Sequence, residues 1–141
     1  MTARHYRELV TWQLADELES ETIRIMKACP KAMDDIRYRG QVFEAATGGP
    51  SNIAEGFSRK SPGDFCRFLD YAIASIDEAA LRLQSGVKRD YFTEETIQPA
   101  LALVRRTRKA AIRLKQTQID LLEKRKAETR RARRPKPDRE T

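Results

Sequence analysis

The chain has 141 residues, of which 40% are hydrophobic and 35% charged, with six glycines and six prolines. This length suits one domain with one modest core, and the composition favours a few long helices over many short strands. The chain contains no run of about 18 apolar residues, and residues 1–10 lack the basic-then-apolar layout of a signal peptide. A cytoplasmic protein without membrane contact is therefore expected.

The net charge of +7 is distributed unevenly along the chain. Residues 1–104 hold 13 Lys and Arg against 16 Asp and Glu, a net charge of −3. Residues 105–141 hold 15 against 5, a net charge of +10. The sequence therefore predicts a mildly acidic body and a basic C-terminal quarter.

The first half of the chain predicts two amphipathic helices. Apolar residues recur at steps of three and four over about residues 6–28, and Pro30 is expected to end this helix. A second helix is predicted over about residues 34–58, because its apolar residues keep helical phase across an internal Gly-Gly-Pro sequence.

The Gly48-Gly49-Pro50 sequence lies inside the second predicted helix. Pro50 removes one backbone donor and crowds the carbonyl four residues earlier, so a kink near Ala46 is expected. The two glycines are expected to loosen the helix, each by about 1 kcal/mol relative to Ala. A phosphate-binding loop is disfavoured, since neither a Gly-Lys-Ser/Thr ending nor a preceding strand is found.

Two further helices complete the expected bundle. The third is predicted over about residues 62–85, with Ser61 as N-cap and Gly86 placed to stop it. The fourth is predicted over about residues 94–122, after Thr93 as N-cap. We expect residues 1–122 to form the bundle, and residues 123–141 to form a basic helical extension that ends in a disordered tail.

Four polar residues on the second and third predicted helices are candidate site residues. They are spaced three residues apart within each helix, so each pair lies near one face. They could form a site, but a buried or interfacial hydrogen-bond network that fixes the helix register is favoured. Catalytic and metal sites are disfavoured because His5 is the only histidine, so neither an enzyme nor a cofactor is expected. The four residues are Asn52, Glu55, Ser75 and Glu78.

The basic residues of the C-terminal quarter are candidate nucleic-acid contacts, because cations along a helix can neutralise successive phosphates. No aromatic residue follows Phe92, so base stacking by this segment is disfavoured. For the second of the two groups, the alternatives are an acidic protein surface or no specific partner. The first group is Arg105, Arg106, Arg108, Lys109, Arg113 and Lys115, and the second is Lys124, Arg125, Lys126, Arg130, Arg131, Arg133 and Arg134.

Three stretches of the chain carry a resemblance to a known family: YRELVTWQLADEL, PSNIAEGFSRKS and FCRFLDYAIASIDEA. Over roughly Tyr6 to Leu114, the sequence resembles the four-helix bundle proteins of the 23S rRNA intervening-sequence family. The resemblance implies an all-α, up-and-down four-helix bundle, commonly assembled as a ring-like pentamer, with no established catalytic activity. The accessory (variability determinant) proteins of diversity-generating retroelements are distantly similar, and they bind a reverse transcriptase and nucleic acid.

These observations together predict a non-enzymatic homo-oligomer that binds RNA or DNA through its basic C-terminal segment. Such a protein would be an accessory of a larger nucleoprotein, for example a reverse transcriptase or ribosomal RNA complex. The alternative is a protein-interaction scaffold whose basic tail binds an acidic protein surface.

Overall fold

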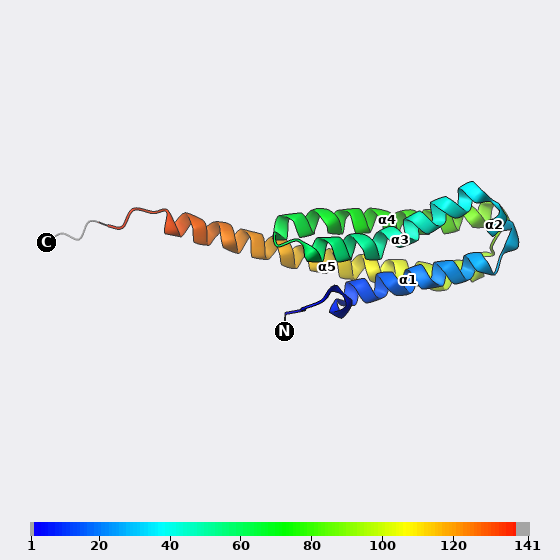
Figure 1. The fold of residues 1–141 in the computed structure, drawn as a ribbon, viewed down its shortest axis with the longest axis horizontal. Coiled ribbons are helices and arrows are strands. Elements are labelled where there is room, and N and C mark those ends of the chain that lie inside the picture. The colour runs from blue at the N-terminus through cyan, green and yellow to red at the C-terminus, as the bar shows by residue number, and fades with distance from the viewer. Residues whose placement is uncertain (1, 138–141) are drawn as a thin grey trace.

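The computed structural model describes residues 2–137. Within these residues the chain forms only helices, and the all-α prediction is confirmed. Figure 1 shows the long helices side by side, with the short helix α2 at one end of the molecule. In chain order the elements are the 3-10 helix η1 (Tyr6–Glu8), α1 (Val10–Lys27), α2 (Pro30–Asp34), α3 (Ile36–Ser58), α4 (Pro62–Lys88) and α5 (Glu94–Ala132).

The four long helices pack as a helical bundle with two clusters of buried side chains. Helix α1 contacts α3 and α5, and α4 contacts the same two helices from the other side. One cluster lies towards α2 and includes Met26, Tyr38 and Leu83, and the other includes Ile53 and Leu69. These five side chains are at most 1% exposed. Burial of an aliphatic side chain of this size stabilises a fold by roughly 1.5–3 kcal/mol.

Capping side chains define where three of the long helices begin. Asp35 accepts a hydrogen bond from the Tyr38 amide at the start of α3, Ser61 caps α4, and Thr93 caps α5. Each cap satisfies a backbone donor that has no partner within its helix. The predicted caps Ser61 and Thr93 are confirmed.

The connection between the first two predicted helices differs from expectation. Helix α1 ends at Lys27, and Pro30 begins the short helix α2 instead of ending α1. Proline suits the first position of a helix because its missing N–H would have no partner there. Helix α1 also begins later than predicted, because Leu9 is extended, with ψ 124°. A helix of five residues is too short to produce a clear periodic pattern.

Helix α3 continues without interruption through Gly48, Gly49 and Pro50, while the kink near Ala46 stays a prediction. The interpretation of the glycines as a loosening element is wrong for Gly48. A Cβ atom at Gly48 would lie 2.7 Å from the Ser75 Cβ on α4. Real Cβ atoms do not approach this closely, so Gly48 is required for the contact between α3 and α4.

Gly86 does not stop α4, which corrects a second expectation. The helix continues to Lys88, and Gly86 is buried within it. A Cβ at Gly86 would lie 2.5 Å from the Phe92 ring, so this glycine makes room for a core aromatic side chain. The backbone leaves the helix in the left-handed conformation at Asp90 instead, with φ 62°.

Helix α5 continues past the predicted boundary at residue 122 and ends at Ala132. Figure 1 shows it extending beyond the other helices. The bundle and the basic extension therefore share one helix, while residues 138–141 of the expected tail lie outside the described residues. Among the helices of residues 2–137, none combines the length and the apolar character needed to cross a membrane.

Candidate nucleic-acid interface

The first basic group lies where α5 still packs in the bundle. Five of its six residues are exposed, and Lys115 is half-buried. Two of the six form ion pairs with acids of α4: Arg108 Nε lies 3.2 Å from Asp77 Oδ1, and Lys115 Nζ lies 2.7 Å from Asp70 Oδ1. The hydrogen bond to Asp70 raises the pKa of Lys115, so its ammonium stays charged. Acids of α4 therefore neutralise two of the six cations in the first basic group.

The other four cations of the first group are Arg105, Arg106, Lys109 and Arg113, and no ion pair joins them to another residue in the described part of the chain. Arg105, Lys109 and Arg113 share one face of α5 because they are four residues apart. Together with Arg108 and Ile112 they line a shallow cavity of about 430 Å³. This face presents positive charge to solvent.

The second basic group surrounds the part of α5 that projects from the bundle. Its seven residues are all exposed, and within residues 2–137 the one ion pair found among them joins Lys126 Nζ to Glu123 Oε1 at 3.7 Å within the helix. Arg133 and Arg134 follow the last helical residue. The positive charge is therefore accessible from all sides of the projecting segment (Figure 1).

Contacts of α5 with the bundle are described at Leu114 and Lys115, and half-buried residues of α5 continue to Leu122. Leu114 packs against the core cluster that contains Phe65. The Cys66 thiol donates a 3.7 Å hydrogen bond to the Lys115 carbonyl, and burial raises the pKa of that thiol. In the described residues that follow Lys115, each hydrogen bond and ion pair of α5 joins residues of the same helix or its C-cap. The second basic group is thus separated from the acidic body.

The four polar candidates on α3 and α4 do not form the expected network between helices. Ser75 lies opposite Gly48, and the other three residues bond within their own helices. No hydrogen bond within residues 2–137 joins these four side chains to one another, and a network at an interface between copies stays a prediction. Within one bundle, the close approach at Gly48 constrains α3 and α4. The bonds are Asn52 Nδ2 to the Gly48 carbonyl (2.7 Å), Arg59 Nη2 to Glu55 Oε1 (2.9 Å) and Arg82 Nη2 to Glu78 Oε1 (3.2 Å).

Comparison with known families identifies the family of this chain. A family model described as 23S rRNA-intervening sequence protein matches residues 7–113. The chain belongs to this family. The match includes most of the bundle and stops within α5, before the second basic group.

Among solved structures, this intervening-sequence protein is similar to a protein of unknown function from the S23 ribosomal protein family of Bacteroides thetaiotaomicron. The two share 17% sequence identity with a TM-score of 0.49, and the alignment covers 77% of this chain and 97% of the other. No curated protein matches the chain.

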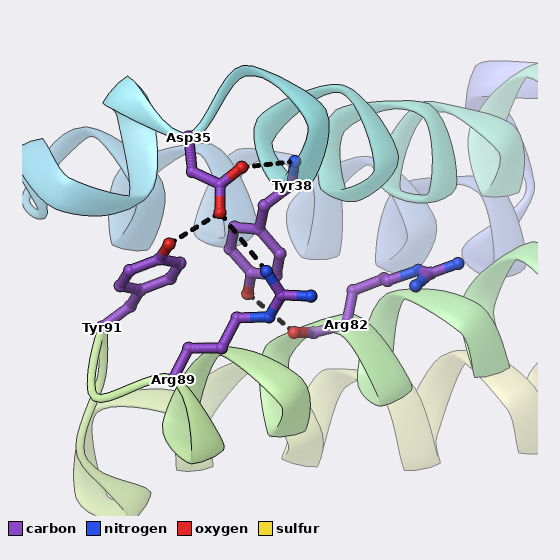
Figure 2. A network of polar contacts seen from close by, with 5 residues as sticks. All are labelled: Asp35, Tyr38, Arg82, Arg89 and Tyr91. Carbon is purple, nitrogen blue, oxygen red and sulfur yellow. Dashed lines mark hydrogen bonds and ion pairs between the residues drawn. The ribbon is translucent and has the colours of Figure 1, made fainter.

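The intervening-sequence protein has another polar cluster, near α2, that the sequence analysis missed (Figure 2). Asp35 accepts hydrogen bonds from the Tyr38 amide (3.1 Å) and the Tyr91 hydroxyl (2.6 Å), and Arg89 Nη1 lies 3.3 Å away. These donors, Tyr91 foremost, lower the pKa of Asp35. Asp35 was recognisable as a residue that precedes a helix, but its partners Arg89 and Tyr91 are more than 50 residues away in the sequence.

Metal chemistry has no candidate site in residues 2–137. No group of three His, Cys, Asp or Glu residues there is arranged to hold a metal ion. The two candidate surfaces of the protein are therefore the cationic α5 helix and the polar cluster near α2.

Proposed function

We propose that this intervening-sequence protein is a non-enzymatic, self-associating helical bundle that binds RNA or DNA through α5 and the residues after it. The observation that carries the proposal is the second basic group, which is exposed on a helix that projects away from the acidic body. The free cations of the first group extend this surface onto the bundle.

The chemistry of these residues favours binding to phosphates over reading of bases. Arg and Lys side chains neutralise phosphates and release condensed counterions, which gives affinity without base contacts. The aromatic residues that could stack on bases all precede α5. Binding should therefore weaken steeply with added salt and discriminate little between sequences.

Self-association is supported by apolar residues on the outer face of α4. Tyr71 is 50% exposed and Leu81 is 59% exposed, and Ala74 lies between them at helical spacing. We propose an up-and-down bundle that buries this face against other copies, and the resemblance to the family suggests a pentamer. An oligomer would gather several projecting helices and strengthen the attraction for a polyanion. A reverse transcriptase or a ribosomal RNA complex is the proposed setting.

The decisive experiment removes the charge of the second basic group while keeping the length of the chain. Replacing its seven Lys and Arg residues with Gln should leave the oligomer mass unchanged, because these side chains lie outside the bundle. The same change should weaken binding to structured RNA and duplex DNA at least about tenfold, or about 1.4 kcal/mol. Light scattering measures the oligomer mass, and fluorescence anisotropy at several salt concentrations measures the binding of nucleic acid.

A chain that ends at Glu123 provides a second test, since it lacks nine Lys and Arg and three Asp and Glu. It should behave like the seven-Gln variant. If the full-length protein does not bind nucleic acid at low salt, or if both variants bind as well as the full-length protein, the proposal fails. The scaffold function, in which the tail binds an acidic protein, would then take its place.

A further inference from the structure

A polar cavity of about 440 Å³ lies between the start of α3 and the end of α4. This is the end of the bundle opposite to the projecting part of α5 (Figure 1). Three arginines and a single acid line the cavity, so its formal lining charge is +2. The lining residues are Asp35, Arg37, Tyr38, Gln41, Arg82 and Arg89.

The one acidic residue of the cavity is already engaged. Asp35 accepts from the Tyr38 amide and the Tyr91 hydroxyl and pairs with Arg89 (Figure 2). The Arg89 guanidinium also lies over the Tyr38 ring, 5.3 Å from its centroid. These contacts hold Arg89 at the wall of the cavity, and they leave Asp35 little capacity to neutralise the other two arginines.

Arg82 lines the cavity from α4. Its Nη2 pairs with Glu78 at 3.2 Å, but its Nε is buried and has no hydrogen-bond partner among the described residues. A buried guanidinium N–H without an acceptor costs free energy. Protein atoms enclose this Nε, so Arg82 contributes to the cavity lining through the remaining part of its side chain, which is 29% exposed.

The α3 side of the cavity adds two more donors. Arg37 and Gln41 are four residues apart, so their side chains lie on the same face of the helix. Arg37 is exposed, and no ion pair of this residue is found within residues 2–137. The cavity thus has cationic donors on α3 and on α4.

We propose that this cavity binds a phosphate group, with Arg37, Arg82 and Arg89 as its cationic donors and Gln41 as a neutral donor. A phosphate monoester carries a charge of about −1.5 to −2 and three acceptor oxygens, which fits the charge of the lining. Planar guanidinium groups match the geometry of its oxygens. The site is independent of the basic α5 surface. The phosphate could belong to a small molecule or to the end of a nucleic acid.

The first experiment titrates the full-length protein with inorganic phosphate and with adenosine 5′-monophosphate, using adenosine as the ligand without phosphate. Calorimetry should detect both phosphate ligands and not adenosine. Arg82→Gln should weaken binding at least about tenfold, and Arg37→Gln at least about threefold. The control Arg106→Gln removes the same charge from α5, which contributes no residue to the lining of this cavity, and should change nothing.

Arg37 is exposed, so its substitution keeps the test valid even if Arg82→Gln fails to fold. Failure to bind either phosphate ligand at about 10 mM would overturn the proposal, and so would equal affinity in Arg37→Gln, Arg106→Gln and the unaltered protein. Loss of nucleic-acid binding by the seven-Gln variant would leave this site unaffected, so the two proposals can fail separately.

A second experiment distinguishes the sources of the phosphate. One RNA sequence is compared with a 5′-phosphate and with a 5′-hydroxyl end, on the full-length protein and on Arg37→Gln. A preference for the phosphorylated end that is lost in Arg37→Gln would identify a terminal phosphate as the ligand. Equal binding of the two RNAs, together with binding of free phosphate, would identify a small phosphate compound.

Discussion

Gly48 of α3 and Ser75 of α4 lie so close together that a methyl group on Gly48 would come within 2.7 Å of the Ser75 Cβ. Neither residue bonds to the other across this contact in the described structure. The absence of a side chain at position 48 is what permits the approach of the two helices. Gly56 repeats the arrangement two turns later, where a Cβ would lie 2.8 Å from the Phe68 Cβ.

Gly48→Ala should therefore destabilise the protein, although alanine is the better helix former. We expect the free energy of unfolding to fall by about 1–3 kcal/mol, the usual cost of overpacking. Gly40→Ala is the matched control in the same helix, because no atom lies within 4 Å of the added methyl group. It should raise stability by up to about 1 kcal/mol. Urea denaturation measures both, and equal stabilisation by the two substitutions would show that Gly48 is not a packing residue.

Stability at high pH should depend on Tyr38. Burial raises the pKa of Tyr38 from 10.0 to about 12, so the folded state favours the neutral phenol. The stabilisation that comes from the raised pKa of Tyr38 is fully present below pH 10 and is lost as the pH rises towards 12. Tyr38→Phe should cost about 1 kcal/mol at neutral pH, because the hydrogen bond to the Arg82 carbonyl is lost.

The diagnostic result is the pH profile of Tyr38→Phe, measured by denaturation between pH 8 and about 12. The free energy of unfolding should decline less steeply above pH 10 in the variant than in the unaltered protein. Tyr6→Phe is the control, because Tyr6 is only half-buried and lies outside the surfaces proposed for binding and assembly, and it should keep the original profile. Parallel profiles for all three proteins would contradict the prediction.

Cations that are already paired should contribute less to nucleic-acid binding than free ones. Arg105 and Arg106 have no acidic partner in the described residues, whereas Arg108 and Lys115 pair with α4. Replacing Arg105 and Arg106 with Gln should reduce the slope of log K against log salt by up to about 2. Replacing Arg108 and Lys115 with Gln should change this slope less and lower stability by about 0–1 kcal/mol for each exposed pair. Identical slopes for the two double variants would refute the distinction.

The outer face of α4 should control assembly. Light scattering at micromolar concentration should show an oligomer for the unaltered protein, and Tyr71→Glu combined with Leu81→Glu should dissociate it. Buried carboxylates without partners are costly, and this supplies the driving force for dissociation. Val10→Glu changes a comparably exposed residue on α1, which is 64% exposed, and should leave the mass unchanged. A monomeric unaltered protein would defeat the prediction.

The features that the sequence predicted correctly are local ones. Ser61 and Thr93 cap helices through bonds to amides three residues away, so their role is visible in a short segment. The roles of Gly48 and Gly86 depend on Ser75, Tyr38 and Phe92, which are brought near only by folding. A glycine close to the end of a periodic segment is equally compatible with a helix stop and with close packing.

The same distinction applies to the candidate sites. The exposure of the second basic group could be predicted from its many cations, because Lys and Arg are almost never fully buried unless they are paired. The arginine-lined cavity joins the start of α3 to the end of α4, and no spacing in the sequence indicates which side chains meet there. The pairing of α5 with acids of other helices was foreseeable, but the choice of Asp70 and Asp77 was not.

The projecting part of α5 has a kinetic and entropic consequence. Beyond Lys115 the helix is held by its own bonds, such as Gln116 Nε2 to Asp120 Oδ1 at 2.9 Å. From Glu123 to Ala132 every residue of α5 is exposed. Isolated helices shorter than about 12–15 residues are marginal in water, so this last stretch should unwind and re-form far more often than the bundle. Its amides should exchange with deuterium first, and trypsin should cut there before it reaches the core. A polyanion that orders this segment must supply binding free energy that offsets the conformational entropy lost by the segment. The length of the ordered helix can then match the surface of the polyanion.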